Sequence, residues 1–276
     1  MMAKIPITVI VPVKNEEVNL PYCLQLLGDF EQIIVVDSNS TDRTITIAEE
    51  YGAEVYQFNW DGRFPKKRNW ALRNLFIRNE WVLFIDADEY ITDAFRSEIQ
   101  QKIKDPEVNG YWVTYRNYFM GKLLKHGYPF IKLPLTRVGT GEYEMIEEDS
   151  WSQLDMEVHE HLIISGKTGH LNATITHNDY KGLDHYISRH NAYSSWEAKR
   201  FLGLQKGGFK TLTFNQKLKY RLMKSGFLPP LYFIGVYLFK LGFLDGLPGY
   251  YIAKYKAHYF FQIQTKITEI LATNKN

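Results

Sequence analysis

The 276-residue chain is poor in cysteine and in net charge. It has one cysteine, Cys23, and its 33 Lys and Arg residues stand against 31 Asp and Glu, which gives a formal charge of +2. A single cysteine excludes an intramolecular disulfide and fits a reducing compartment, where its simplest role is that of a small buried apolar residue. A balance this close to neutral does not indicate nucleic acid as a partner.

The chain also lacks a long uninterrupted apolar run. The nearest candidate for a membrane-spanning helix, Phe227 to Leu244, contains two prolines and a lysine. The amino-terminal residues MMAKIPITVIVPV lead directly into a strand-like segment, without the apolar core and cleavage site of a signal peptide. We therefore expect the protein to act in the cytosol. With 45% hydrophobic and 23% charged residues, it has the composition of an ordered globular protein.

The first hundred residues alternate between strand-like and helix-like segments. Continuous apolar runs predict strands, and segments of helical periodicity separate them, at 7–13, 32–38, 53–60 and 80–90 for strands and 19–27, 41–52 and 65–77 for helices. Strands without polar alternation are buried on both faces. The sequence therefore predicts an α/β fold with a mostly parallel sheet and helices on both faces.

The pattern changes twice further along the chain. Aromatic strands such as GYWVTYRNYF follow residue 105, and helical periodicity dominates from Gly182 onward. The glycine-containing stretch GLQKGG, 203–208, is the best boundary signal. We predict a catalytic domain over 1–205 and a helical extension over 206–276, which is rich in basic and aromatic residues.

Three of the predicted strands end in polar residues: VPVKNEE, VVDSNSTD and FIDADE. In an open parallel sheet, ligands bind beyond the carboxyl ends of the strands, so these clusters should gather at one edge.

If Asp86 and Asp88 continue their strand, they share a face about 6 to 7 Å apart. At an effective dielectric near 20 they repel by roughly 2 to 3 kcal/mol. A hard divalent cation, Mg²⁺ or Mn²⁺, is the natural compensation. The alternative is a solvated turn whose acids cap the next helix.

Four segments, in this order and spacing, carry a resemblance to the inverting family-two glycosyltransferases with a GT-A fold: VPVKNEEVNLPYCL, VVDSNSTDRTITIAEEYGAEV, FPKKRNWALRN and VLFIDADEYIT. The branch that the chain resembles most adds glucose or heptose to bacterial lipopolysaccharide core and related glycans. The resemblance is strong over residues 5 to 105, and the stretches MEVHEHL and GFLDGLPGYYIAKYKAHYFF extend it. It implies that 1–105 binds a nucleotide-sugar, a UDP-sugar by preference, and that 106–205 binds the acceptor.

The resemblance also implies roles for individual residues. Those that line the nucleotide pocket are Pro12, Asn15 and Glu16. Asp37 accepts a hydrogen bond from the base, Asp86 lies by the ribose, and Asp88 binds the metal. The start of the third helix, Lys66 to Asn69, suits the diphosphate because of its positive charge and free backbone N–H groups, with Lys66 and Arg68 as the main candidates. Read alone, the KKR run is more typical of a solvated basic surface.

An inverting transfer needs a carboxylate that takes the proton of the acceptor hydroxyl. The stretch DMEVHEHL offers Glu160, which the resemblance favours, with Glu157 in reserve. Alternation along a strand places Glu157 and His159 on one face and Glu160 on the other, so the residues alone leave the choice open. His159 is a further candidate metal ligand, although a lone histidine is more often held by hydrogen bonds. His170 and His177 remain unassigned.

The carboxy-terminal extension combines basic and aromatic residues. Seven basic residues and one acid, Asp245, lie between Lys217 and Lys256. This composition suits helices on an anionic bilayer, and a lipid-linked acceptor would make that contact useful. We expect peripheral attachment to the cytoplasmic face of the inner membrane. The alternative is that the aromatic residues pack on the catalytic domain or at a dimer interface.

Two other function classes compete with a glycosyltransferase. A nucleotidyltransferase acting on sugar phosphates also uses acidic metal ligands, but it ordinarily has a glycine-rich loop after the first strand, where this chain has VPVKNEE. A non-catalytic glycan-binding or membrane-scaffold protein on a degenerate fold has no reason to keep three polar strand ends. Both alternatives are therefore weaker.

Overall fold

The structure is a computed structural model, and it describes residues 4–127, 130–146, 152, 154–155, 161–207 and 214–273. The chain divides into two compact units. The first comprises Met1–Tyr118 and Pro129–Tyr180, and the second comprises Phe119–Tyr128 and Lys181–Asn276. The boundary predicted at residues 205 and 206 falls inside helix α5 (Gly182–Gly207) of the second unit.

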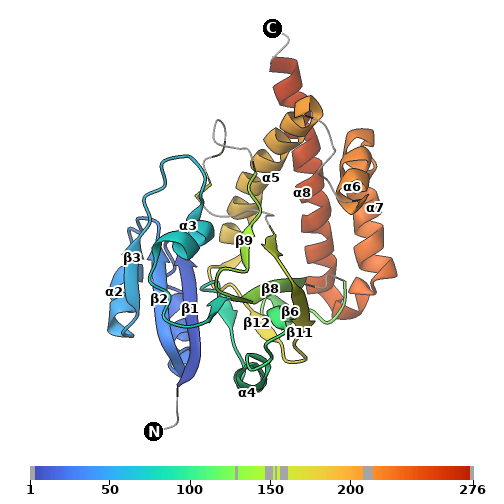
Figure 1. Cartoon of the computed structure of the whole chain (residues 1–276). Coiled ribbons are helices and arrows are strands. Elements are labelled where there is room, and N and C mark those ends of the chain that lie inside the picture. The colour runs from blue at the N-terminus through green and yellow to red at the C-terminus, as the bar shows by residue number, and fades with distance from the viewer. Residues whose placement is uncertain are drawn as a thin grey trace. The chain divides into compact units, whose positions relative to one another are not determined.

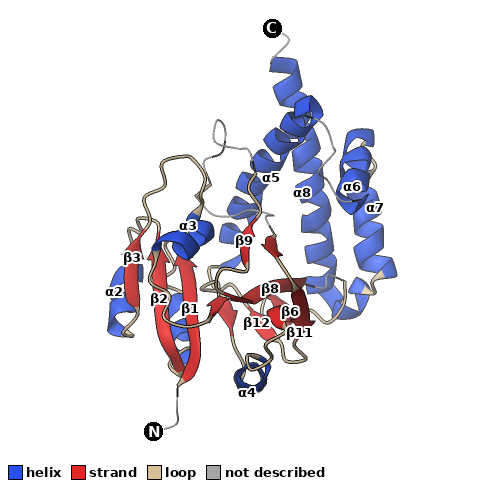
Figure 2. Ribbon diagram, in the orientation of Figure 1, coloured by secondary structure: helices blue, strands red, loops and turns tan. Residues whose placement is uncertain are grey.

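The first unit is built on a mixed sheet, which Figure 2 shows in red. Its amino-terminal part is parallel and has the strand order β3, β2, β1, β4. The next strands along the sheet are β8, β6, β12 and β5. The pairs β4–β8, β8–β6 and β12–β5 are antiparallel. The bounds in sheet order are Glu54–Gln57, Phe30–Asp37, Ile5–Val13, Trp81–Phe84, Phe130–Arg137, Val108–Phe119, Ile175–His177 and Glu89–Tyr90. The predicted α/β class is confirmed.

Four helices connect strands in this unit: α1 (Leu20–Leu26), α2 (Thr44–Glu50), α3 (Lys67–Asn74) and α4 (Asp93–Lys102). The ends follow from local chemistry. The Thr92 hydroxyl accepts a hydrogen bond from the backbone N–H of Phe95 at 3.1 Å, which caps α4. After α2 the chain turns at Gly52, whose φ of 73° lies in the left-handed region that glycine tolerates best.

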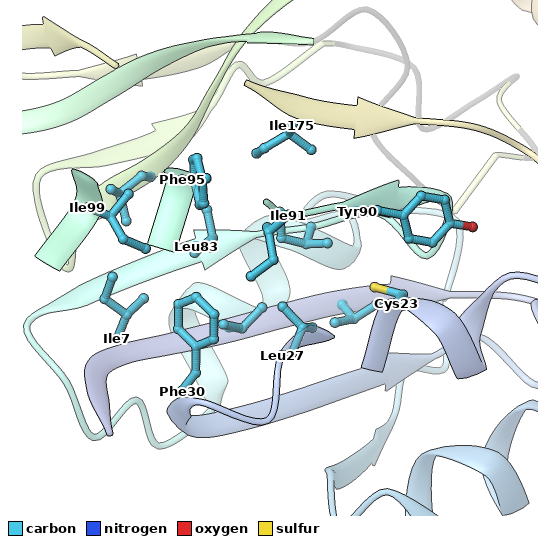
Figure 3. Close-up of a cluster of buried hydrophobic side chains, with 14 of the residues drawn as sticks. Ile7, Cys23, Leu27, Phe30, Leu83, Tyr90, Ile91, Phe95, Ile99 and Ile175 are labelled. Carbon is cyan, nitrogen blue, oxygen red and sulfur yellow. The ribbon is translucent and has the colours of Figure 1, made fainter. Parts of the chain in front are cut away.

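Buried side chains lie on both faces of the sheet. Along β1, Val9 and Val11 belong to one apolar cluster and Ile10 belongs to another, as the alternation of a strand requires. Figure 3 shows part of the larger cluster, with Cys23 of α1 among its apolar neighbours. Cys23 is buried and burial raises the pKa of its thiol, so its predicted packing role is confirmed.

The smaller strands of the first unit are β9 (Gly141–Tyr143), β10 (Leu162–Ile164) and β11 (Lys167–His170). Strands β9 and β10 form an antiparallel pair. A Cβ atom at Gly141 would lie 2.5 Å from the Ile163 carbonyl oxygen, so only glycine permits this approach. Strand β11 pairs with β6 in parallel.

Among its described residues, the second unit contains the short strand β7 (Lys122–Leu123), and helices form most of the rest. Helices α5 and α7 (Leu228–Ile234) pack along α8 (Gly246–Thr273), as Figure 1 shows. Between α7 and α8 lie a π-helical turn, η1 (Gly235–Phe239), and a 3₁₀ turn, η2 (Gly242–Asp245). Helix α6 (Phe214–Ser225) completes the unit. The apolar core of the second unit includes Ala198, Phe201, Tyr220, Met223, Leu228, Tyr259, Ile263 and Ile267.

Within the described residues, no single helix has the length and apolar character of a membrane span. One pair of helical segments, 217–223 and 228–239, has the length and apolar character of a span only when the two are taken together. The chain bends by 118° between them.

Candidate active site

The carboxyl ends of β1 and β2 meet at one edge of the sheet, as predicted. Val13 lies opposite Asp37 in the parallel register, and the two following loops are joined directly. The backbone N–H of Thr41 donates to Asn15 Oδ1 at 2.8 Å, and that of Glu16 donates to Thr44 Oγ1 at 2.8 Å. Asn15 has a φ of 54°, which asparagine tolerates because its short side chain bonds locally. These bonds fix the loop that holds two of the predicted pocket residues.

Asp37 and Glu16 are held by their own loops. Asp37 is buried at the end of β2, and its carboxylate accepts hydrogen bonds from the backbone N–H of Ser40, at 2.9 Å, and from the Ser40 hydroxyl. Glu16 Oε2 accepts from Asn19 Nδ2 at 3.0 Å. Pro12 pairs in register with Val36 inside the sheet. These predicted pocket residues therefore lie on one rigid scaffold.

The basic run at the start of α3 is buried rather than solvated. Lys66, Lys67 and Arg68 are only 3%, 2% and 9% exposed. The Lys67 ammonium donates to the Val13 carbonyl oxygen at 2.8 Å and lies 3.7 Å from Asp155 Oδ2. The solvated-surface alternative for this run is therefore wrong. Lys67 thus holds a positive charge at the edge where β1 ends.

Asn69, also in this run, fixes the position of strand β9. Its side-chain amide donates to the Tyr143 carbonyl oxygen at 2.9 Å and accepts from the Tyr143 N–H at 2.8 Å. Its amide therefore satisfies both backbone groups of one residue. Asn69 is a structural residue of the basic run.

The acidic strand end does not continue as a strand. Strand β4 ends at Phe84, and a turn over 86–89 is closed by the backbone N–H of Glu89, which donates to the Asp86 carbonyl oxygen at 2.9 Å. The expectation that Asp86 and Asp88 share one strand face is therefore wrong. The turn forms because the Glu89 carboxylate accepts the Asp86 N–H at 3.0 Å and thereby satisfies a buried donor.

Two protein cations compensate the charge of Asp86. Arg68 Nη2 lies 2.5 Å from Asp86 Oδ1, and Lys132 Nζ of β8 lies 2.9 Å from Asp86 Oδ2 and 2.5 Å from Glu89 Oε1. Burial disfavours the charged form of Asp86, but Lys132 and Arg68 outweigh it and hold the pKa of that carboxyl well below its usual range. The cation that the sequence indicated for Asp86 is thus supplied by the chain itself.

Glu89 has the opposite electrostatic character. Burial and the neighbouring charges of Asp86 and Asp88 raise the pKa of Glu89 to about 7, against the lowering effect of Lys132. Burial disfavours the charged form of Lys132, but the carboxylates of Asp86 and Glu89 raise its pKa overall. Lys132 therefore bridges two carboxyl groups whose pKa values are shifted in opposite directions.

Asp88 faces a histidine. The shortest distance between Asp88 Oδ2 and His177 Nε2 is 3.3 Å, and the Asn178 N–H donates to the Asp88 carbonyl oxygen at 2.9 Å. The contact arises because β5 and β12 pair antiparallel, with His177 opposite Glu89. Burial disfavours the imidazolium, but Asp88 raises the pKa of His177 overall.

A carboxylate and an imidazole side by side are ligand types that Mn²⁺ accepts. In the part of the chain that the structure describes, no group of three or more His, Cys, Asp or Glu residues is arranged to hold a metal ion. The pair of Asp88 and His177 therefore fits a cation that takes its other ligands from substrate phosphates or water, as Mg²⁺ and Mn²⁺ do at phosphate sites.

Three predicted site residues, Glu157, His159 and Glu160, lie outside the described residues. The described residues on either side of them form hydrogen bonds with other segments of the first unit. The Asp155 carbonyl oxygen accepts from the backbone N–H of Lys67 at 3.3 Å, and the His161 carbonyl oxygen accepts from the Glu144 N–H at 2.9 Å.

Sequence reasoning missed Lys132 and left His177 unassigned. Lys132 lies in the otherwise largely apolar run FIKLPLTR, and a lone lysine in such a strand was the available signal. His177 is the last residue of the short strand β12, and nothing in its immediate sequence connects it to Asp88. Both contacts depend on strand pairing between distant segments.

The polar ends of β1 and β2, the buried Lys67 and Arg68, and the turn at Asp86 lie at one edge of the sheet. The family model described as Glycosyl transferase family 2 matches residues 8–161. The chain belongs to glycosyltransferase family 2. It is therefore an enzyme of the glycosyl-transferring class, and the family predicted from the sequence is confirmed.

Relatives in this family cover most of the chain. The lipopolysaccharide core biosynthesis glycosyltransferase LpsC of Rhizobium meliloti is 27% identical over 281 residues, which span 97% of this chain and 93% of LpsC. An uncharacterized glycosyltransferase of Rickettsia conorii is 26% identical over 246 residues, which span 85% of this chain and 82% of that protein. Among solved structures, the mannosyltransferase PcManGT of Pyrobaculum calidifontis, in complex with GDP-Man and Mn²⁺, matches with a TM-score of 0.51. It is 15% identical and covers 97% of this chain and 88% of its own, which supports the fold.

Proposed function

We propose that this family member is a metal-dependent inverting glycosyltransferase. It transfers a hexose or heptose from a nucleotide-diphospho-sugar, a UDP-sugar by preference, to a glycolipid or polysaccharide-precursor acceptor in cell-envelope glycan biosynthesis. The observation that carries the proposal is the strand edge where two buried cations lie, Lys67 against the Val13 carbonyl oxygen and Arg68 against Asp86. The name of LpsC supports the envelope acceptor, and the GDP-Man and Mn²⁺ complex of PcManGT supports the donor class and the metal.

The donor binds at the carboxyl ends of β1, β2 and β4. Pro12, Asn15 and Glu16 line the nucleotide pocket, Asp37 accepts from the base, and Asp86 lies by the ribose. The carboxylate of Asp37 already accepts two hydrogen bonds from Ser40, and ionised carboxylate oxygens have lone pairs for a further donor.

Lys66 and Arg68 bind the diphosphate. A guanidinium has five N–H donors, and the bond from Arg68 Nη2 to Asp86 uses one side of that fork. The positive charge of Arg68, held beside Asp86, attracts the diphosphate. The start of α3 adds backbone N–H groups without intrahelical partners, which favour an anion.

Asp88 and His177 would hold the divalent cation, Mg²⁺ or Mn²⁺, with His159 as a further candidate ligand. The bound cation would neutralise the charge that develops on the departing nucleotide diphosphate. Lys66 and Arg68 act in the same direction because their charges are fixed before the substrate arrives.

Glu160, or Glu157 in its place, removes the proton from the attacking acceptor hydroxyl. The support is chemical, since a carboxylate is the base that an inverting displacement needs. The neighbouring residue Asp155 lies against Lys67 of the basic run, which brings the flank of this acidic stretch to the donor edge.

We propose that the enzyme works on the cytoplasmic face of the inner membrane, where a cytosolic nucleotide-sugar and a lipid-linked acceptor meet. Nucleic acid has no part in this function.

A donor and acceptor screen tests the proposal. Nucleotide release is measured with UDP-, GDP- and ADP-linked hexoses and heptoses, with and without extracted lipid-linked core glycans, in Mn²⁺ or in EDTA. We expect turnover with one nucleotide class that requires both the cation and the lipid acceptor. Transfer that persists undiminished in EDTA, or in the variant Asp88→Ala, would refute the metal assignment. Absence of any acceptor-dependent release would refute the acceptor class.

A further inference from the structure

The second unit exposes a group of large apolar side chains where the chain reverses between α7 and α8. We call this group the apolar tip; it comprises Ile234, Leu238, Phe239, Leu241, Phe243, Leu244 and Leu247, and each is at least 38% exposed. Phe239 is 80% exposed. So many neighbouring exposed apolar side chains on a folded surface mark an interaction site.

The backbone of the tip is held firmly. Asp245, which is buried, accepts hydrogen bonds from the backbone N–H groups of Lys125 at 3.1 Å and His126 at 2.9 Å. The Gly127 N–H donates to the Lys240 carbonyl oxygen at 2.8 Å. These bonds fix both sides of the turn from a second segment of the same unit. The exposed side chains are therefore presented on a built scaffold rather than on a loose end.

Glycine makes the turn compact. A Cβ atom at Gly249 would lie 2.1 Å from the Gly242 carbonyl oxygen, and one at Gly242 would lie 2.8 Å from that of Val236. No other residue fits either position without a shift of the backbone. The start of α8 and the two short helical turns before it therefore lie in direct backbone contact.

Other aromatic residues of the same segment pack inside the unit. The ring centroids of Tyr232 and Phe260 lie 4.8 Å apart, and those of Phe233 and Tyr237 lie 5.2 Å apart. The sequence alone did not separate these rings from Phe239 and Phe243. Among the residues that the structure describes, the unit thus has its own core, to which no tip residue belongs, and Phe243 touches the packed rings only through Tyr237 at 6.3 Å between centroids.

The charge beside the tip is positive. Residues 214–268 contain eight Lys and Arg and one acid, and that acid is the buried Asp245. Arg221, Lys240 and Lys254 are exposed. An isologous contact between two copies would bring these like charges together, which is unfavourable. A partner with an apolar interior and an anionic surface satisfies both features.

We infer that the apolar tip inserts into the boundary between headgroups and acyl chains of an anionic bilayer, with Lys240 and Lys254 against lipid phosphates. Amphipathic surfaces of this composition bind membranes through buried apolar area together with attraction to anionic lipid. None of the tip residues belongs to the strand edge of the first unit, so membrane binding and sugar transfer can be measured separately.

Vesicle flotation of the full chain tests this inference, with phosphatidylglycerol–phosphatidylethanolamine vesicles and neutral phosphatidylcholine vesicles. The double variant Phe239→Ser/Leu244→Ser should lower the partition coefficient on anionic vesicles by about 100-fold, or about tenfold for each side chain withdrawn from the bilayer. The matched control is Phe76→Ser, which changes a side chain that is 76% exposed in the first unit. The control should bind like the wild type.

Charge is tested by Lys240→Gln/Lys254→Gln, which should weaken binding to anionic vesicles by about 30-fold and leave the weak binding to neutral vesicles unchanged. Circular dichroism and nucleotide release check that each variant is folded. Equal flotation of the wild type and the Phe239→Ser/Leu244→Ser variant would overturn the inference. A wild-type dimer that this variant dissociates, without vesicle binding by either protein, would also overturn it and assign the tip to a second copy.

Discussion

Lys132 offers the sharpest test of how the site is held together. Its ammonium lies 2.9 Å from Asp86 and 2.5 Å from Glu89, and no sequence signal connects these three residues. The variant Lys132→Met keeps most of the aliphatic length and removes the charge. In this variant Asp86 still pairs with Arg68, whereas Glu89 loses its contact with the Lys132 ammonium.

The expected loss follows from burial. Removing one partner of a fully buried ion pair costs 3 to 5 kcal/mol, because the remaining charge is left uncompensated. The Glu89 side chain is 2% exposed, whereas those of Asp86 and Lys132 are 26% and 32% exposed, so water screens part of the effect. We therefore expect a decrease of about 3 kcal/mol in the unfolding free energy of the first unit, at the lower end of that range.

Urea unfolding of the metal-free protein, followed by tryptophan fluorescence, measures this loss. The matched control is Lys167→Met, which breaks an exposed pair with Glu107 at 3.0 Å and should leave the unfolding free energy almost unchanged. The double variant Lys132→Met/Glu89→Gln should recover at least about 1 kcal/mol, since it removes the unpaired carboxylate. If Lys132→Met is no less stable than Lys167→Met, the proposed electrostatic role of Lys132 is incorrect.

Two further predictions concern the base and the second unit. Glu160→Gln should keep donor binding and lower turnover by about 10² or more, as measured by single-turnover transfer, whereas the same loss in Glu157→Gln alone would reassign the base. Burial, together with Arg189, lowers the pKa of Lys256 to about 8 from its ordinary 10.5, so between these pH values the unfolded chain binds more protons and stability rises with pH. Lys256→Met should therefore stabilise the second unit at pH 7 by up to about 3 kcal/mol, with the gain vanishing near pH 10.5. Urea unfolding at both pH values measures this, and a gain that is independent of pH would contradict it.

The sequence was sufficient to predict the first half of the sheet, because each of these strands is indicated by its own apolar run. Each of the four predicted strands overlaps a strand of the structure, and their polar ends meet where parallel connections require. The helix stop at Gly52 was equally readable, since it depends on one residue.

The parts that sequence reasoning missed depend on long-range pairing. Lys132 reaches Asp86 across 46 residues of chain, and His177 reaches Asp88 because β12 joins the sheet beside β5. Burial of the KKR run was also invisible, since its composition is that of a solvated surface. The carboxylates Asp86 and Asp88 were found, but their partners could not be assigned from spacing alone.

The central claim is that Asp88 and His177 hold the cation of a nucleotide-sugar site. Titration of Mn²⁺ into the protein saturated with nucleoside diphosphate, followed by electron paramagnetic resonance, tests it directly. We predict that Asp88→Ala and His177→Ala each weaken Mn²⁺ binding by at least about tenfold while circular dichroism stays unchanged. Wild-type Mn²⁺ affinity in both variants would contradict the account.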